Sequence, residues 1–254
     1  MTTTDHPLTI HALPTEQEMG AAAAAAAAPI LREAILGRGR ARLTLAAAPS
    51  QSATLRALAA DGSIDFSSID CFHMDDYIGL APEAPQGFGN WLEHELFHAV
   101  TPHSFHRIDV TADPEDAAET YRAAMGEEPF DVTLCGLGVN GHLAFNEPFA
   151  ADFADEKWAR VITLTEESLE QQVGEGHFPD VDSTPHTAIS LTIPALLSAA
   201  HVQVCTPESR KAKAVAAALN DEISTACPAT KLREAANARL FLEPESAALL
   251  EQPA

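Results

Sequence analysis

Short apolar runs alternate with longer amphipathic segments along the chain. The apolar runs, which predict strands, are Arg42–Ala47, Ser68–Met74, Phe130–Cys135, Arg160–Leu164, His201–Cys205 and Arg239–Leu242. The segments that predict helices are Ala21–Ala28, Thr54–Leu58, Asn90–Ala99, Glu115–Met125, Ser209–Leu219 and Ser246–Leu250. Strands separated by helices predict an α/β fold of the Rossmann-like kind, with a doubly wound, mostly parallel sheet and helices on both faces.

Polar residues mark the starts of two of these helices. Thr15, followed three residues later by Glu18, predicts a capping box in front of the alanine-rich run. Ser50 is expected to cap the helix around Thr54–Leu58 in the same way.

The 254 residues are predicted to form a single domain over residues 1–254. The sequence has no internal repeat and no linker rich in proline, glycine or serine. The segment Gln171–Pro185 is the longest stretch without clear periodicity. It is therefore a candidate for a lid over a binding site.

The composition is strongly acidic. Fifteen Lys and Arg residues against 37 Asp and Glu residues give a formal net charge of -22. This charge repels nucleic acid and anionic lipid, so neither is expected as a partner. An anionic small molecule needs local donors here, which makes each of the four lysines informative: Lys157, Lys211, Lys213 and Lys231.

The cysteines and the N-terminal segment predict a cytoplasmic protein. The four cysteines are far apart and form no CxxC pair, as expected for buried thiols in a reducing compartment: Cys71, Cys135, Cys205 and Cys227. No basic stretch precedes an apolar one as in a secretion signal. The run Ala21–Ala28 is too weakly apolar to span a membrane, and Pro29 follows it, so no membrane association is expected.

The segment His94–His98 matches the HExxH pattern of zinc proteases. Two histidines one helical turn apart can share a metal ion, but the extended pattern that supplies a third ligand is absent. Trp91, Leu92 and Leu96 give the segment an apolar face. An amphipathic packing helix explains this pattern, and no metal is expected.

The segment Gly136–Gly141 matches the GxGxxG pattern of dinucleotide-binding folds. Such a fold needs a helix at this point, but Pro148 follows closely and leaves room for little more than one turn. His142 and Glu147 also add polar groups where a packing helix would be apolar. The glycines instead predict a backbone that turns sharply and approaches a ligand, and no nucleotide cofactor is expected.

Polar side chains follow several of the predicted strands at the points where those strands end. Asp75 and Asp76 follow one strand, and His142 and Glu147 follow another. The loop Ala46–Ser52 presents serine hydroxyls and backbone N–H groups at a helix start, which suits an anion. Because the carboxyl ends of parallel strands line one crevice, we expect these groups to surround one small molecule.

Four segments resemble a known family. FHMDDYIGL (Phe72–Leu80) and LCGLGVNGHLAFNEP (Leu134–Pro148) are similar to the two signature segments of the glucosamine-6-phosphate deaminase family. HTAISLTIPALLSA (His186–Ala199) and PESRKAKAV (Pro207–Val215) are similar to that family in order and spacing. The resemblance extends over most of residues 42–246.

The resemblance implies an enzyme that converts glucosamine 6-phosphate and water to fructose 6-phosphate and ammonia, in the deaminase/phosphogluconolactonase type of fold. Asp75 then moves a proton from C2 to C1, His142 opens the pyranose ring, and Glu147 orients His142. Asn140 stands where some members have an aspartate, so it orients the imidazole without supplying charge. No metal and no organic cofactor are required.

The resemblance also implies which residues contact the sugar phosphate. They are Ser50, Gln51, Ser52, Asp76, Gly141 and Lys211. Lys211 matches a phosphate-binding lysine, whereas the arginine expected within Gln171–His177 is absent. Phosphate binding is therefore expected to depend on Lys211, on the helix start at Ser50 and on His177.

Two other functions fit the same fold. A 6-phosphogluconolactonase-like hydrolase would act on a sugar-phosphate lactone, but the lactonases carry a GxxDGHTASLFP-like loop from which Phe145–Pro148 departs. A non-catalytic sugar-phosphate sensor would bind its ligand without turnover. The sequence does not decide between a monomer and a homo-oligomer.

Overall fold

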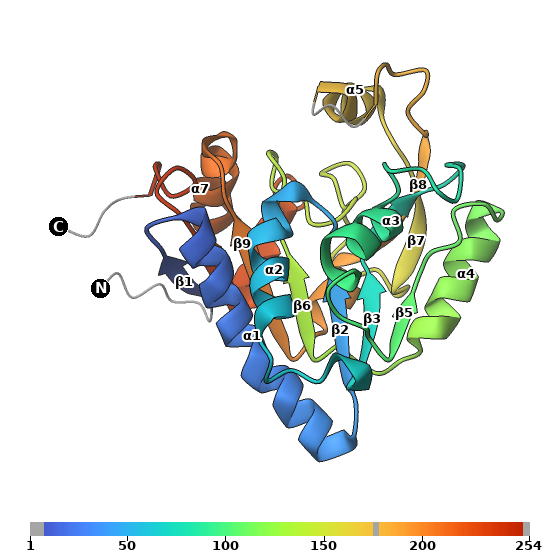
Figure 1. The fold of residues 1–254 in the computed structure, drawn as a ribbon. Helices are drawn as coiled ribbons and strands as arrows, with labels where there is room; N and C mark the ends of the chain where they lie inside the picture. Colours follow the sequence, from blue (N-terminus) through green and yellow to red (C-terminus); the bar gives the residue numbers. More distant parts are fainter. Residues whose placement is uncertain (1–7, 175–177, 251–254) are drawn as a thin grey trace.

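The computed structural model describes residues 8–174 and 178–250, which form two β-sheets flanked by helices (Figure 1). The larger, 7-stranded sheet is parallel, in the order β1-β10-β9-β6-β2-β3-β5. Its strands are β1 (Thr9–Ala12), β2 (Ala41–Leu45), β3 (Ile69–His73), β5 (Ser104–His106), β6 (Val132–Cys135), β9 (His201–Thr206) and β10 (Ala238–Leu242). The 3-stranded sheet is antiparallel, in the order β4-β8-β7. Its strands are β4 (Asp75–Tyr77), β7 (Ala159–Thr163) and β8 (Thr187–Leu191).

Helices cover both faces of the larger sheet. The longer helices are α1 (Glu16–Arg38), α2 (Ser52–Ala60), α4 (Pro114–Met125), α5 (Glu166–Gly174) and α7 (Ala212–Asn220). The shorter helical segments are α3 (Phe88–Leu92), α6 (Ile193–Leu197), η1 (Pro49–Gln51), η2 (Phe66–Ser68), η3 (Glu93–Phe97), η4 (Ser209–Lys211) and η5 (Pro228–Glu234). On one face α1 and α2 pack on the sheet through a core that includes Leu31 and Leu55. On the other face α4 and α7 contribute Tyr121 and Val215 to a second core.

The predicted fold class is confirmed, because the sheet is mostly parallel and carries helices on both faces. All the strands that the apolar runs predict are present, with bounds close to those expected. The strands β1, β4, β5 and β8 were not predicted, and with β4 and β8 the antiparallel sheet was missed.

Two local predictions are wrong. Ser50 does not cap the helix that follows it, because Pro49 starts a helical turn one residue earlier and Ser50 lies inside that turn. Residues Ser246–Leu250 form turns instead of a helix. The carboxylate of Glu243 accepts the N–H groups of Glu245 and Ser246 at this point, and Leu249 is exposed.

Helix α1 begins with the predicted capping box. The hydroxyl of Thr15 accepts the N–H of Glu18 at 3.1 Å and donates to its carboxylate at 2.9 Å. The helix then continues through Pro29 to Arg38. By length and composition alone its 23 residues would suffice for a membrane span. In this structure one side of the helix is buried against α2 and the larger sheet.

The predicted lid segment Gln171–Pro185 is irregular only in part. Its beginning completes α5, residues 175–177 lie outside the described residues, and residues 178–185 lead back to β8 through bends and turns. Helix α5 stands apart from the layers of the larger sheet (Figure 1). Leu169 and Phe178 pack there with Tyr77 in a small apolar cluster. Movement of this segment as a lid stays a prediction.

Candidate active site

A cavity of about 210 Å³ opens at the carboxyl ends of β2, β3, β6 and β9. This is the edge of a parallel sheet at which α/β proteins bind their ligands. The residues predicted from the sequence that line it are Ser50, Gln51, Asp75, His142, Glu147 and Lys211. The predicted residues Ser52, Asp76, Asn140 and Gly141 do not line it, although each is next to or in contact with one that does.

Asp75 lies where the chain passes from the larger sheet to the smaller one. Strand β3 ends at His73, and β4 begins at Asp75, which pairs with Ser190 of β8. Asp75 is 7% exposed. Burial, together with the neighbouring carboxylate of Asp76, raises the pKa of Asp75 well above the usual aspartate range. A carboxylate in such a setting is a stronger base than an exposed one, which suits removal of a proton from carbon.

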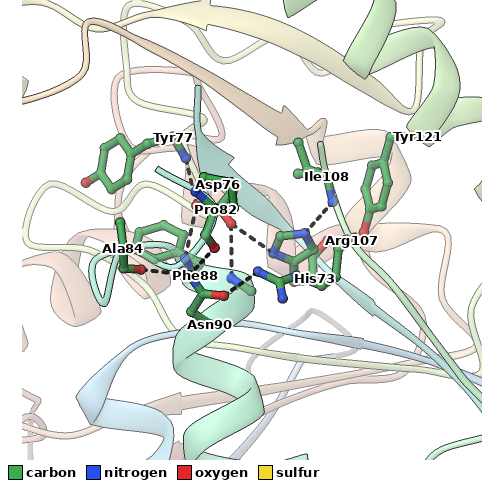
Figure 2. Close-up of polar contacts among 11 residues, drawn as sticks. His73, Asp76, Tyr77, Pro82, Ala84, Phe88, Asn90, Arg107, Ile108 and Tyr121 are labelled. Atoms are coloured by element: carbon green, nitrogen blue, oxygen red, sulfur yellow. Dashed lines mark hydrogen bonds and ion pairs between the residues drawn. The ribbon is translucent and has the colours of Figure 1, made fainter. Parts of the chain in front are cut away.

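Asp76 follows the predicted base in the chain and holds the start of α3 in place (Figure 2). Its carboxylate accepts N–H groups from Tyr77 at 2.9 Å, Phe88 at 3.0 Å and Gly89 at 3.0 Å. Burial raises the pKa of Asp76, and these three bonds and Arg107 act in the opposite direction. The carboxylate is thus engaged by the backbone, and the predicted contact between Asp76 and the sugar finds no support in this arrangement.

His73 extends this buried network, as Figure 2 shows. Its Nε2 accepts the N–H of Ile108 at 2.8 Å, so Nδ1 carries the proton and faces the Asp76 carboxylate at 3.7 Å. Burial, with a contribution from Arg107, lowers the pKa of His73 to about 3, and the ring is therefore neutral. Arg107 is fixed in turn by a 2.6 Å hydrogen bond to Asn90. The network supports the turn that presents the base.

The substitution Asp76→Asn tests this supporting role. An amide nitrogen facing the Gly89 N–H leaves a buried donor without an acceptor, so we expect a loss of about 1–3 kcal/mol in the free energy of unfolding. Removing the carboxylate also removes a charge that raises the pKa of Asp75. The acid limb of kcat/KM is therefore expected to move to lower pH, as measured in a pH–rate profile beside a thermal melt. An acid limb that stays in place in a folded variant contradicts the proposed coupling.

His142 is held by two acceptors on one side of its ring. Nδ1 lies 3.0 Å from Oε1 of Glu147 and 2.9 Å from Oδ1 of Asn140. Because both neighbours accept hydrogen bonds, Nδ1 carries the proton of the neutral ring, and Nε2 is the basic nitrogen. Asn140 also donates to Oε2 of Glu147 at 2.5 Å, so the three side chains form one network. This arrangement suits proton transfer through Nε2 of His142.

The glycines of the GxGxxG pattern make room for neighbouring groups, and Gly138 makes room for this histidine. A Cβ on Gly138 would lie 2.1 Å from Cε1 and 2.2 Å from Nε2 of His142. Gly141 has a φ of +81°, and a Cβ there would lie 2.3 Å from Sγ of Cys227. Turns, and no helix, follow these glycines. The sharply turning backbone is as expected, whereas the close approach at Gly138 is to the imidazole of His142. An approach of this backbone to a ligand stays a prediction.

Strand β8 connects the two groups that are predicted to transfer protons. The N–H of Leu191 donates to the carbonyl of Met74 at 2.7 Å, immediately before Asp75. The side chain of Asn146 donates to the carbonyl of Leu191 at 2.7 Å. The smaller sheet thereby fixes the loop of residues 142–147 relative to Asp75.

Donors that suit an anion also line the cavity. Lys211 is 7% exposed and lies just before α7. Gln51, in the turn after β2, donates its amide to the carbonyl of Cys205 at 3.0 Å and to Oγ of Ser50 at 3.2 Å. A Cβ on Gly136 would lie 2.7 Å from that amide, which explains a small residue there. His177, the other predicted phosphate contact, lies outside the described residues.

Three further polar residues that line the cavity were missed in the sequence: Gln172, Glu208 and Arg210. Gln172 reaches it from α5 and accepts the hydroxyl of Tyr77 at 2.5 Å. Glu208 has a φ of 83° and forms an ion pair with Nε of Arg210. The only signal for this pair in the sequence is its proximity to Lys211.

The HExxH segment contributes no lining residue to the cavity. His94 lies on the π-helical segment η3 and His98 caps its end, with their ring centroids 6.3 Å apart. Glu95 forms an ion pair with Arg56 at 2.7 Å, and Leu96 is buried. Within residues 8–174 and 178–250, no three His, Cys, Asp or Glu side chains are arranged to hold a metal ion. The segment packs against α2.

Known proteins are similar to this chain in sequence and in fold. The model of the family described as glucosamine-6-phosphate isomerases/6-phosphogluconolactonase matches residues 14–241. The chain belongs to this family. A glucosamine-6-phosphate deaminase of Exiguobacterium sibiricum is 33% identical over 192 residues, which cover 73% of this chain and 74% of that protein. Another, from Halothermothrix orenii, is 31% identical over 200 residues, which cover 75% and 78%.

Solved structures of the family have the same architecture. A monomeric glucosamine-6-phosphate deaminase superposes with a TM-score of 0.83 at 26% identity, covering 95% of this chain and 99% of that one. A 6-phosphogluconolactonase from Shewanella baltica superposes with a TM-score of 0.76 at 18% identity, covering 93% and 97%. The second likeness concerns the fold alone.

Proposed function

We propose that this protein is a glucosamine-6-phosphate deaminase, which converts glucosamine 6-phosphate and water to fructose 6-phosphate and ammonia. The observation that carries the proposal is one cavity lined by Asp75, by the pair His142 and Glu147, and by Lys211. A base, an oriented imidazole and a cation are the kinds of group that this reaction needs. The names of the relatives from E. sibiricum and H. orenii support the same activity.

His142 opens the sugar ring in this mechanism. Nε2 takes the proton of the anomeric hydroxyl, and the imidazolium returns a proton to the ring oxygen as the C1–O5 bond breaks. The carboxylate of Glu147, 3.0 Å from Nδ1, stabilises the charged ring between these two transfers. Asn140 keeps the ring oriented.

Isomerisation and loss of ammonia follow at C2 and C1. Asp75 removes the C2 proton, and the C2–H electron pair forms the C1=C2 double bond while the C1 oxygen takes a proton from the C2 ammonium group, which gives the enol. Asp75 then returns its proton to C1. The product is an iminium group at C2. Water adds to that carbon, and the resulting carbinolamine releases ammonia to leave the C2 ketone of fructose 6-phosphate. We assign the phosphate to Lys211 and to the turn that contains Ser50 and Gln51.

Two other activities on this fold are weaker alternatives. A lactonase would hydrolyse 6-phosphogluconolactone without forming ammonia, and the 6-phosphogluconolactonase structure is more distant in sequence. A sensor would not need the Asp75 and His142–Glu147 arrangement, which is specialised for proton transfer. Neither alternative therefore predicts release of ammonia from glucosamine 6-phosphate.

Turnover of glucosamine 6-phosphate by the purified protein is the first expected result. Ammonia and fructose 6-phosphate should form in equal amounts, as measured by coupled assays of both products. The control is 6-phosphogluconolactone, from which we expect no enzyme-dependent hydrolysis. Hydrolysis of the lactone with no ammonia from the amino sugar would assign the lactonase activity. Binding of glucosamine 6-phosphate with neither reaction would assign the sensor.

We also infer a cytoplasmic location and a role in the catabolism of amino sugars. The four cysteines are free and buried, which fits a reducing compartment. The partner is a small sugar phosphate.

A further inference from the structure

The segment between β9 and α7 reaches the cavity with three charged side chains, of which the preceding mechanism uses only Lys211. Glu208, Arg210 and Lys211 all line the cavity. Glu208 has a φ of 83°, a backbone conformation that non-glycine residues rarely adopt. The carboxylate of Glu243 accepts the N–H of Glu208 at 3.0 Å and thereby supports this conformation. The segment is therefore built into a defined shape at the cavity.

Arg210 is directed by an ion pair within this segment. Its Nε donates to the carboxylate of Glu208, and its side chain is 49% exposed. Lys211 follows it in the chain and is 7% exposed. Recognition of phosphate by arginine uses two parallel N–H bonds, a geometry that lysine does not offer. Arg210 thus adds a directional group beside the buried ammonium.

Binding of a phosphate dianion in this cavity requires more than one cation, because the cavity wall also carries carboxylates. Asp75, Glu147 and Glu208 place three carboxylates on that wall, and the whole chain has a net charge of -22. Among the described residues that line the cavity, the arginine is Arg210 and the lysine is Lys211. One ammonium does not offset these carboxylates and a dianion together, since like charges in a partly buried site repel strongly.

We propose that Arg210 is a specificity-determining residue of this site, which binds the phosphate of the substrate together with Lys211. The proposal deepens the proposed function and rests on it for the identity of the sugar. Glu208 holds the guanidinium at the cavity wall through Nε. Arg210 then supplies, from the β9 side, the arginine contact that α5 and the following residues do not provide.

The test compares Arg210→Ala with Lys213→Ala. Lys213 lies two residues after Lys211, carries the same charge as Arg210 and is exposed on α7, outside the cavity lining. We expect Arg210→Ala to raise KM for glucosamine 6-phosphate roughly 100-fold with little change in kcat. Lys213→Ala should behave as the unchanged protein. Arg210→Lys should recover part of the loss, because it restores charge without the bidentate geometry.

A binding measurement separates this proposal from the proposed function. Inorganic phosphate is titrated into each folded variant by calorimetry, with no turnover required. We expect its affinity to fall in Arg210→Ala and to persist in Lys213→Ala, whether or not ammonia is produced from the amino sugar. Equal phosphate affinity in the two alanine variants overturns the role of Arg210. Absence of turnover in the unchanged protein, with phosphate affinity lost only in Arg210→Ala, overturns the deaminase assignment alone.

Discussion

Asp75→Asn is expected to remove turnover while making the protein more stable. The amide has almost the same shape as the carboxylate but does not accept a proton from carbon, so kcat should fall by roughly 10³-fold or more. Binding of the sugar phosphate should persist, because the proposed phosphate contacts are on other loops. Steady-state assays of ammonia release and calorimetric binding of glucosamine 6-phosphate measure the two effects.

The gain in stability follows from the burial of Asp75. Its pKa is raised in the folded protein, so the folded state holds a proton that the unfolded chain releases above about pH 4. The stability associated with that proton is complete below the unfolded pKa and is lost as the pH rises through the folded pKa. Asparagine at position 75 does not titrate, so the variant does not lose stability in this pH range. We therefore expect Asp75→Asn to melt about 2–6 °C higher at about pH 8 and to show no such advantage at about pH 4.

The exposed residue Asp116, on α4, provides a matched control for Asp75. Asp116→Asn makes the same change in net charge without touching the cavity lining, so its kcat should equal that of the unchanged protein. An Asp75→Asn variant with undiminished kcat would falsify the assignment of the base. If Asp75→Asn melts at a lower temperature than the unchanged protein at both pH values, burial of the ionised Asp75 carboxylate does not destabilise the fold.

Gly138→Ala is expected to reduce kcat by roughly 100-fold through the position of His142 alone. The added Cβ would lie 2.1 Å from the ring, so the imidazole must move by about an ångström, which is enough to spoil proton transfer. Gly138 is not among the glycines with positive φ, so alanine adds no backbone strain there. Phosphate affinity should change little, because Lys211 is not displaced.

Gly62→Ala serves as the control for this substitution. A Cβ on Gly62 meets nothing within 4 Å, and its φ is not positive. Its kcat and melting temperature should match those of the unchanged protein. Full activity in Gly138→Ala would show that the glycine is not needed to seat His142. Equal losses of kcat and phosphate affinity would point to general collapse of the site.

The sequence predicts the parallel sheet and the grouping of the main polar residues, because both depend on local patterns. Short apolar runs identify strands, and polar residues at their carboxyl ends meet at one edge of the sheet. Asp75, His142 and Glu147 were grouped in this way, and all three line the cavity.

Features that depend on distant partners were not predictable in the same way. Strands β4 and β8 are short and lie more than one hundred residues apart, so their pairing is set by tertiary packing. Asp75 and Asp76 are adjacent on a strand and therefore face opposite sides, but the sequence does not say which one faces the cavity. The expected cap at Ser50 failed for a local reason, because Pro49 starts a helical turn one residue earlier.

The attachment of both proton-transfer groups to β8 has a consequence for how this protein can diverge. A substitution at Leu191 or at its hydrogen-bonded neighbours disturbs Asp75 and the His142 loop together, so the chemistry is inherited as a unit. The segment of residues 207–211 is connected to a different sheet and carries its own support from Glu243. Selection for a new anion or a differently placed one can therefore act on that segment while the reaction itself is conserved.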